Sequence, residues 1–302
     1  MPHIFECKKF WQSPHNRTLP QDFCKRTLLM GIVNATPDSF SDGGKFLIPR
    51  AAAEHAKTLI ADGADIIDLG AESTRPGSRK ITPDEEWQRL SPALSAIREN
   101  LPDVPVSIDT SNAEVAEKAV AAGADILNDV CAIGERCTTA GTPYPLGTIA
   151  ARTGTPLIAM HNRFTNPNYR NFWTDFLDDL QAGIERILNC GVPAEQLWID
   201  PGFGFGKTPE QNLEIVARLR EIAELGFPVL LGTSRKSTLG IVLGGKPPEA
   251  RTGGDSACAA LGAFHGAACL RLHDIAAHKD VVAVADAVFR NAPAQASFPK
   301  LA

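Results

Sequence analysis

Polar side chains follow short apolar segments at eight places along the chain. In chain order these places carry Asn34, Asp68, Asp109, Asn128-Asp129, Met160-His161-Asn162, Asp200, Ser234-Arg235-Lys236-Ser237 and Arg271 to Asp274. Carboxylate and amide oxygens accept hydrogen bonds, whereas Arg, Lys and His donate them and bring positive charge. Any one position has a plain explanation, because Asp and Asn are common turn residues. Eight together favour a shared polar ligand, since buried carboxylates and amides need partners.

Several familiar catalytic motifs are absent. The segment Asp200 to Thr208, DPGFGFGKT, is not a P-loop, because the first Gly of GxxxxGK[ST] would fall on Pro201. The segment Gly232 to Lys236 fails the GxSxG pattern, because Lys236 replaces the second Gly. The chain has no HExxH, and no Cys/His group has the spacing of zinc ligands. The chemistry must therefore come from the dispersed polar residues.

The elements that position these residues are short strands alternating with helices. Helical stretches end in Gly, for example Gly63, Gly123 and Gly226, and an apolar segment follows each. The expected strands are 28–34, 66–69, 104–109, 126–128, 157–160, 197–199, 229–231 and 269–272. Such alternation predicts βαβ units with a parallel sheet buried on both faces. Eight regular units favour an α/β fold of the (β/α)8 TIM-barrel type over an open doubly wound sheet.

The expected organisation is a single domain. Residues 1–26 precede the first strand and form an N-terminal extension, residues 27–292 form the barrel, and residues 293–302 form a C-terminal tail. Thr82 before Pro83 predicts a helix start, and a second helix is expected over 51–61. A third is expected from Asn112 to Ala122, capped by Thr110 or Ser111.

In such a barrel the catalytic groups stand at the C-terminal ends of the strands, where the eight polar positions fall. Arg271 and His273 lie two residues apart, so they would point to the same side of the last strand. Barrels often bind phosphate near strands seven and eight. We therefore favour an anion site here over the alternative, a structural ion pair.

Bulk properties exclude several classes of protein. The chain has 302 residues, of which 44% are hydrophobic and 22% charged, as in an ordinary globular protein. The net charge of −5 argues against a general nucleic-acid binder. No apolar run approaches the ~20 residues of a membrane span, and the N-terminus lacks the apolar core of a signal peptide. Seven Cys without a CxxC pair predict free thiols in a reducing cytoplasm.

Two loops and several strand ends now identify a family. Asn34 to Gly44, NATPDSFSDGG, and Gly70 to Ser78, GAESTRPGS, resemble the two loop signatures of the dihydropteroate synthases. The other motifs match in order: Ser107-Ile108-Asp109-Thr110, Asn128-Asp129, Asp200 to Lys207, Ser234 to Ser237 and Arg271 to Asp274. The resemblance covers residues 28 to about 290.

The resemblance implies a reaction. That family joins 7,8-dihydropterin-6-ylmethyl diphosphate to 4-aminobenzoate, releasing diphosphate, with Mg²⁺ assisting, in folate biosynthesis. It also implies a homodimer and no nucleic-acid or membrane partner. Departures fall in the fourth and fifth loops, where Cys131-Ala132 replaces an expected Ser-Gly and Asn162-Arg163-Phe164 follows Met160-His161.

The resemblance also implies roles for individual residues. Pterin binding is assigned to Asp109, Asn128, Met160, Asp200 and Lys236. Diphosphate binding is assigned to Asn34, Arg271 and His273, and Asn34 also reaches the metal. The 4-aminobenzoate pocket is bordered by Thr74, Pro76, Phe205, Lys207 and Ser237. The expected catalytic set is Asn34, Asp42, Asp68, Arg75 and Lys236, in which Arg75 and Asp42 help close the site and Asp68 orients the second loop.

Three rival functions remain open at this point. A pterin-dependent methyltransferase would share the pterin residues but should lack both loop signatures. A non-catalytic pterin-binding paralogue would be supported by a replaced catalytic position, and none is seen. A phosphosugar barrel would not need three acidic or amide groups deep in its mouth.

Overall fold

The computed structural model describes residues 11–35, 47–71, 81–134, 144–164 and 167–291. Its strands are β1 (Leu28–Asn34), β2 (Ile66–Gly70), β3 (Val106–Asp109), β4 (Ile126–Gly134), β5 (Leu157–Asn162), β6 (Leu197–Asp200), β7 (Leu230–Leu231) and β8 (Cys269–Leu272). Its α-helices are α1 (Leu47–Asp62), α2 (Pro83–Asn100), α3 (Ala113–Ala121), α4 (Pro145–Thr153), α5 (Phe172–Asn189), α6 (Pro209–Ala217), α7 (Leu219–Ala223), α8 (Ser237–Val242), α9 (Thr252–Phe264) and α10 (Lys279–Asn291).

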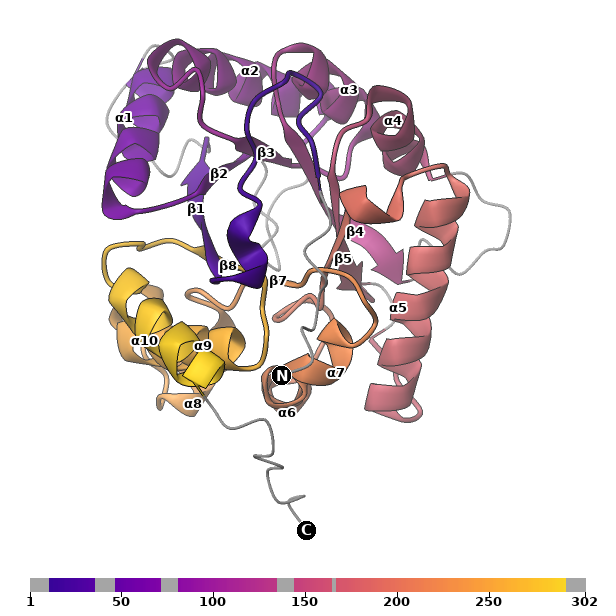
Figure 1. Cartoon of the computed structure of the whole chain (residues 1–302), viewed down its shortest axis with the longest axis vertical. Helices are drawn as coiled ribbons and strands as arrows, with labels where there is room; N and C mark the ends of the chain where they lie inside the picture. Colours follow the sequence, from indigo (N-terminus) through magenta and orange to yellow (C-terminus); the bar gives the residue numbers. More distant parts are fainter. Residues whose placement is uncertain (1–10, 36–46, 72–80, 135–143, 165–166, 292–302) are drawn as a thin grey trace.

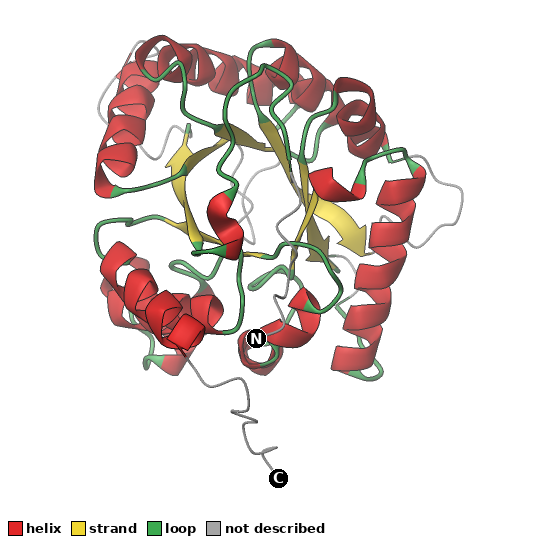
Figure 2. Cartoon of the chain, viewed as in Figure 1, coloured by secondary structure: helices red, strands yellow, loops and turns green. Residues whose placement is uncertain are grey.

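The strands form one parallel sheet that curls into a barrel. Their order is β6-β5-β4-β3-β2-β1-β8-β7, so β1 pairs with both β2 and β8. A parallel bridge between Ile199 and Val229 joins β6 to β7 and closes the ring. The helices lie outside the strands (Figures 1 and 2). The predicted (β/α)8 TIM barrel is confirmed.

All eight expected strands are present, with some shifted ends. β4 runs past Asn128 to Gly134, with a register shift between Asp129 and Ile133 against β5. β3 begins at Val106, after Pro105, which has no N–H to donate. The helix after β3 is capped by neither Thr110 nor Ser111. Asn112 caps it instead, by accepting from the backbone N–H groups of Glu114 and Val115.

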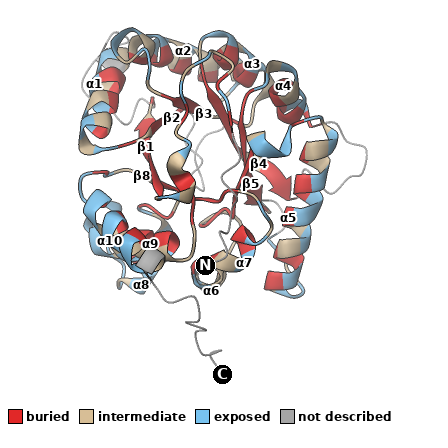
Figure 3. Ribbon diagram, in the orientation of Figure 1, coloured by how far each residue is buried: buried red, intermediate tan, exposed pale blue. Residues whose placement is uncertain are grey.

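The barrel has two packed layers of apolar side chains. Leu59, Leu94, Ile108 and Phe176 belong to the larger one, between the strands and the surrounding helices. The smaller one fills the barrel where the strands begin, with Leu28, Met30, Ile66, Ile126, Ile158, Trp198, Leu230 and Cys269. Buried residues accordingly follow the strands and the inner faces of the helices (Figure 3).

Residues 11–26 close this N-terminal end of the barrel, across which they run (Figure 1). Trp11 stacks on Trp198 with ring centroids 3.9 Å apart, and Phe23 meets the same ring edge-on at 5.0 Å. Leu19 belongs to the same buried cluster. The extension therefore completes the core, and the polar mouth is left at the opposite end.

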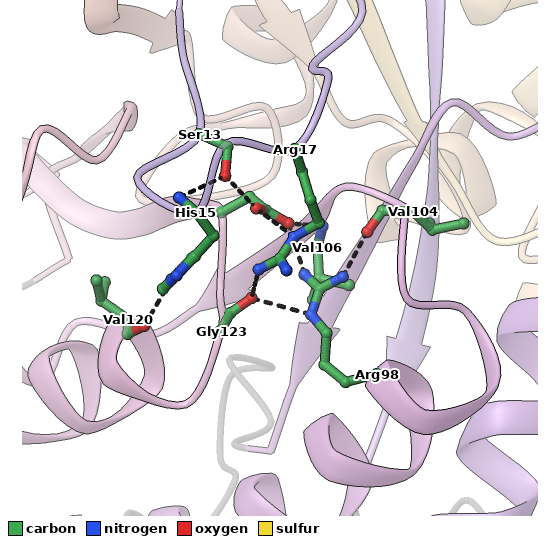
Figure 4. A network of polar contacts seen from close by, with 9 residues as sticks. Ser13, His15, Arg17, Arg98, Val104, Val106, Val120 and Gly123 are labelled. Atoms are coloured by element: carbon green, nitrogen blue, oxygen red, sulfur yellow. Dashed lines mark hydrogen bonds and ion pairs between the residues drawn. The ribbon is translucent and has the colours of Figure 1, made fainter.

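A buried carboxylate ties the extension to the barrel (Figure 4). Asp125, which is fully buried before β4, accepts from Ser13 Oγ at 2.5 Å and from Arg17 Nε at 2.8 Å. Its other oxygen accepts from Arg98 of α2 at 2.5 Å and from the backbone N–H of Val106 at 3.0 Å. Asp125 is thus paired with two guanidinium groups, as a buried charge requires.

No helix within the described ranges is both long and apolar enough to cross a membrane.

Candidate active site at the mouth of the barrel

Three strands bring ion-pairing groups together at the mouth. Asp68 of β2, Asp109 of β3 and Arg271 of β8 come from segments far apart in sequence. Arg271 donates from Nε to Asp68 Oδ2 at 2.6 Å and from one terminal nitrogen to Asp109 Oδ2 at 2.9 Å. Side-chain exposure is zero for Asp68, 13% for Asp109 and 18% for Arg271, so only the last two reach the opening.

Burial governs the charge state of this group. It raises the pKa of the Asp109 carboxyl, because the cost of desolvating the charged form exceeds the attraction to Arg271, and nearby Asp68 adds repulsion. The two carboxylates raise the pKa of Arg271, although burial opposes them. Arg271 therefore stays charged, whereas burial favours the protonated form of Asp109.

Asn128 adds a free acceptor beside these charges. Its Nδ2 lies 3.3 Å from Asp68 Oδ2, and the side chain is buried. Its Oδ1 has no hydrogen-bond partner among the residues that the structure describes. A buried carbonyl oxygen without a donor costs free energy. The site therefore offers an acceptor to a ligand N–H group at this position.

Asp200 supplies a third carboxylate deep in the mouth. It ends β6 in register with Met160 of β5, and both are buried. Its Oδ1 accepts from the backbone N–H of Gly202 at 2.7 Å. Burial raises the pKa of Asp200 to about 6, since that hydrogen bond and the more distant cations offset only part of the desolvation.

The glycine-rich loop after β6 folds around Lys207. Lys207 Nζ donates to the backbone oxygens of Gly202 and Phe205, both at 3.0 Å, and to that of His161 at 3.3 Å. Gly202 has φ +70°, and a Cβ there would lie 1.9 Å from the His161 oxygen. All three donors of the ammonium are thus used within the protein. Burial lowers the pKa of Lys207 to about 7.

Phe205 and Lys236 form a pair at the rim. Lys236 Nζ lies 3.8 Å from the centroid of the Phe205 ring, a cation–π contact. Gly204 runs beside this lysine, where a Cβ would come within 3.0 Å of Lys236 Cδ. Ser237 is exposed at the first position of α8. The aromatic face, the ammonium and the hydroxyl therefore come from two neighbouring loops.

His273 follows β8 and contacts Ser234, which in turn lies beside Asp255, a residue that the sequence did not point to. Its Nδ1 lies 3.0 Å from Ser234 Oγ, and its backbone N–H donates to the same oxygen at 3.3 Å. Ser234 Oγ in turn lies 3.4 Å from Asp255 of α9, which also accepts from the backbone N–H of Arg235 at 2.9 Å. Asp255 carries no recognisable sequence signal, since an acidic residue in a first helical turn is ordinary.

A second missed group lies behind the loop after β5. His161 is fully buried and its Nε2 is 2.9 Å from Asp179 of α5, which also accepts from Arg163 Nε at 2.6 Å. Burial, with Lys207 nearby, lowers the pKa of His161 to about 3, so the imidazole is neutral. The sequence after His161 departs from the family motif, and the carbonyl oxygen of His161 accepts a hydrogen bond from Lys207.

Some predicted residues contact one another, and others lie outside the described residues. Asp68, Asp109, Asn128 and Arg271 make direct contact with one another, and Phe205 contacts Lys236. Asn34 ends β1, half-buried, in register with Gly70. Asp42, Thr74, Arg75 and Pro76 lie outside the described residues.

The contacts of Arg271 and Asp68 bear on their predicted roles. Arg271 makes ion pairs with Asp68 and Asp109, which was the less favoured of its two predicted roles. Its anion-binding role stays a prediction. Asp68 contacts Arg271 and Asn128, and its predicted effect on the second loop falls outside the described residues.

Known proteins share both the sequence and the fold. Residues 30–273 match the family model described as pterin binding enzyme. A dihydropteroate synthase of Clostridium beijerinckii is 44% identical over 88% of this chain and 96% of its own, and one of Bacillus subtilis is 42% identical over 86% and 88%. The crystal structure of the Clostridium difficile dihydropteroate synthase in the presence of pteroic acid has a TM-score of 0.82 at 41% identity, covering 88% of this chain and 98% of that one. The Xanthomonas albilineans dihydropteroate synthase with 4-aminobenzoic acid has a TM-score of 0.80 at 39% identity, covering 89% and 94%. The chain therefore belongs to the pterin-binding enzyme family, among the dihydropteroate synthases.

Proposed function

We propose that this chain condenses 7,8-dihydropterin-6-ylmethyl diphosphate with 4-aminobenzoate, giving 7,8-dihydropteroate and diphosphate, as a transferase of folate biosynthesis. One observation carries the proposal beyond family membership. Carboxylate, amide and guanidinium groups from β2, β3, β4 and β8 contact one another at one mouth, and Asp200 of β6 lies near the same cations. A ring with several N–H groups on one edge needs such acceptors.

Acceptors for the pterin are the first component. Asp109, Asn128 and Asp200 present oxygens, and the unpartnered Oδ1 of Asn128 is suited to a ring N–H group. Met160, in register with Asp200, supplies an apolar surface for a flat ring. Binding through ionised carboxylates favours their charged forms, which offsets the burial that raises the pKa of Asp109 and Asp200.

Cations for the departing diphosphate are the second component. Cleavage of the C–O bond to the diphosphate leaves the electron pair on oxygen, so negative charge builds on the leaving group. Arg271 and His273 stabilise that charge by donating hydrogen bonds. The pterin methylene becomes electron-poor as the bond lengthens, and the nearby carboxylates of Asp68 and Asp109 stabilise it. The amine of 4-aminobenzoate then attacks the methylene carbon and loses a proton.

The pocket for 4-aminobenzoate is the third component. Phe205 offers a ring face and Lys236 a positive charge beside it, and Ser237 adds a hydroxyl at the start of α8. An aromatic carboxylate fits this combination of apolar surface and cation. Thr74 and Pro76 would border the pocket from the second loop, and Arg75 with Asp42 would help to close it against water.

Mg²⁺ is the implied cofactor. Within the described ranges no group of three or more His, Cys, Asp or Glu side chains could hold a metal ion. That fits Mg²⁺, which keeps several waters and takes substrate phosphate oxygens with one or two protein ligands. Asn34, half-buried at the end of β1, would be such a ligand through its amide oxygen. When bound, the ion would neutralise charge on the diphosphate.

A homodimer completes the proposed assembly. Large apolar side chains are exposed on three helices near the C-terminus: Ile241 and Val242 of α8, Leu261 of α9, and Val284 and Val288 of α10. α9 and α10 pack against each other. Large apolar side chains exposed on neighbouring helices can mark a protein interface. We propose that a second copy of the chain covers these helices, and that the protein works in the cytoplasm, where its free cysteines stay reduced.

The test is a coupling assay with the purified protein, dihydropterin diphosphate, 4-aminobenzoate and Mg²⁺. We expect equal amounts of dihydropteroate and diphosphate, with none of either when 4-aminobenzoate is omitted. Pterin binding without product, at enzyme concentrations near those of the substrates, would instead indicate a binding protein without this activity.

A further inference from the structure

Asp255 is a buried carboxylate that the proposed reaction does not use. It lies in the first turn of α9 with an exposure of 3%, twenty residues after the loop that it contacts. It accepts from the backbone N–H of Arg235 with both oxygens, at 2.9 and 3.2 Å, and lies 3.4 Å from Ser234 Oγ. A buried carboxylate is costly unless its oxygens are used. Burial raises the pKa of the Asp255 carboxyl, and these hydrogen bonds from Arg235 and Ser234 oppose that rise.

The loop that it holds has a strained backbone. Arg235 has φ +59°, a left-handed conformation that a side chain with a Cβ rarely adopts. Two groups of the α9 end brace it: Asp255 holds its N–H, and Arg251 donates to its carbonyl oxygen at 2.7 Å and to that of Lys236 at 3.2 Å. Strained residues persist where their surroundings determine them. Asp255 thus helps to fix the backbone conformation of Arg235, the residue before Lys236.

Hydrogen-bond direction extends this influence to His273. Ser234 Oγ has one proton and can donate it either to the Asp255 carboxylate or to His273 Nδ1. A carboxylate can only accept, and a charged acceptor binds a hydroxyl proton more strongly than a neutral one. The proton therefore goes to Asp255, and Ser234 Oγ accepts from the backbone N–H and from Nδ1–H of His273. Nε2 is then the ring nitrogen that gains a proton when an anion arrives.

We infer that Asp255 is a positioning residue for the leaving-group side of the site: through Ser234 it holds His273 in the Nδ1–H form, and through Arg235 it holds the loop that carries Lys236. The inference rests on the proposed function for its meaning. The tautomer that it assigns is a property of the free protein. A positive charge on His278 would lower the pKa of Asp255, and Nδ1 of His278 contacts the Asp274 carbonyl oxygen.

Asp255→Asn is the direct test. The amide keeps an acceptor for Arg235 but turns a donor toward Ser234, whose proton must then go to His273 Nδ1. We expect the ¹⁵N imidazole signals of His273 to change from the Nδ1–H to the Nε2–H pattern. We also expect inorganic pyrophosphate to bind about tenfold more weakly, because His273 then donates from a neutral Nε2–H and no longer from an imidazolium. Affinity for the dihydropterin without diphosphate should stay unchanged.

Asp286→Asn is the matched control. Asp286 of α10 is also buried and also accepts from one backbone N–H and one hydroxyl, those of Thr27 at 2.7 and 2.8 Å, at the opposite end of the barrel. Its substitution should lower thermal stability and leave the His273 signals and pyrophosphate affinity as in the wild type. Ser234→Ala, which leaves the Arg235 contact in place, should weaken pyrophosphate binding as Asp255→Asn does.

Two results would overturn the inference. One is an Nε2–H form of His273 in the wild-type protein, and the other is the same loss of pyrophosphate affinity in both Asp→Asn variants. If Asp255→Asn does not fold, Ser234→Ala decides alone, and unchanged pyrophosphate affinity in it rejects the inference. Absence of dihydropteroate synthesis by the wild type would reject the proposed function and leave the tautomer result standing.

Discussion

Arg271 donates from Nε to Asp68 Oδ2 at 2.6 Å across the barrel mouth, although 203 residues separate them in sequence. The contact joins β8 to β2, with β1 between them in the sheet. Arg271 also reaches Asp109 on β3 at 2.9 Å. One guanidinium therefore pairs with two carboxylates, and burial of a carboxylate without such a partner would be costly.

Loss of this cation should destabilise the fold. Arg271→Met leaves the fully buried Asp68 without its ion-pair partner, which by general experience costs about 3–5 kcal/mol. The double variant Asp68→Asn/Arg271→Met should regain part of that loss, because the uncompensated charge is gone. Urea unfolding of the three proteins measures this. A double variant less stable than Arg271→Met would mean that Asp68 is held by something other than Arg271.

The same residue should discriminate between two ligands. If Arg271 turns toward the diphosphate when substrate binds, Arg271→Met should weaken binding of the dihydropterin diphosphate more than binding of the bare dihydropterin. Charge-assisted hydrogen bonds of this kind contribute about 1.5–3 kcal/mol, a loss of tenfold or more. Calorimetric titration with both ligands is the measurement. Equal losses would assign Arg271 to the pterin side alone.

Asp200 should show opposite effects on binding and stability. Burial raises its pKa to about 6, so the folded protein disfavours its charged form relative to the unfolded chain. Its folded pKa lies above the unfolded one, so its stabilising contribution is full below pH ~4 and lost as the pH rises through ~6. Asp200→Asn should therefore raise the melting temperature at pH 8 by a few degrees and not at pH 4.

Pterin affinity should depend on pH in the opposite sense to the stabilising contribution of Asp200. Only the ionised Asp200 accepts from two ring N–H groups, so wild-type affinity should fall as the pH drops below about 6. Asp200→Asn should bind the pterin weakly at every pH and lose that acid limb. Titrations of both proteins between pH 5 and 8 make the comparison, with Asp286→Asn as the buried-carboxylate control. If Asp200→Asn still loses pterin affinity at low pH, that loss must be assigned to Asp109 instead.

The regular parts of this molecule could be read from the sequence, because each strand is a short apolar run after a helix-ending glycine. Gly63, Gly123, Gly154, Gly191, Gly226 and Gly266 all have positive φ, as that reading requires. The N-cap at Asn112 was missed, because Thr110, Ser111 and Asn112 are all good caps, and only geometry decides among neighbours. The full lengths of β4 and β5 were missed because polar residues interrupt or end them: β4 continues past Asn128-Asp129 to Gly134, and β5 ends in His161-Asn162.

Contacts within the site were harder to foresee than its membership. The positions of Asp68, Asp109 and Arg271 at strand ends predicted that they would share one mouth. They did not predict that Arg271 would bridge Asp68 and Asp109. The sequence did not show that the three donors of Lys207 go to backbone oxygens, and its place at the border of a substrate pocket stays a prediction. Asp255 could not be found at all, because long-range contact between a helix and a loop leaves no local pattern. The role of the N-terminal extension could not be predicted either, because it depends on how residues 11–26 fit the closed end of the barrel.

Lys207 should act through the loop that it holds. Lys207→Met removes the three hydrogen bonds to the oxygens of His161, Gly202 and Phe205, and leaves the Gly202 oxygen with the backbone N–H of Phe205 as a donor. Phe205 should then lose its fixed position beside Lys236. We expect KM for 4-aminobenzoate to rise about tenfold and KM for the pterin substrate to change little. Steady-state kinetics with each substrate varied in turn make the measurement.

Lys207→Arg separates position from charge in that experiment. A guanidinium keeps the charge but has a planar fork in place of a compact ammonium, so it cannot reach three oxygens grouped around one point. It should behave like Lys207→Met. Recovery of wild-type KM values by Lys207→Arg would show that the charge, and not the hydrogen bonds to the loop, is what matters.

Trp11 should stabilise the barrel without affecting its chemistry. It is 1% exposed, stacks on Trp198 and donates from its indole nitrogen to the Pro20 oxygen at 2.9 Å. Trp11→Ala leaves a cavity at the closed end of the barrel, and comparable substitutions cost about 3–5 kcal/mol. Because the polar groups lie at the other end of the strands, both KM values should stay unchanged at temperatures where the variant is folded. Trp11→Phe should lose less stability, and Gln12→Ala, at an exposed neighbour, almost none. A changed KM in Trp11→Ala would mean that the extension controls the mouth through the strands, and the separation of a supporting end from a reacting end would then fail for this barrel.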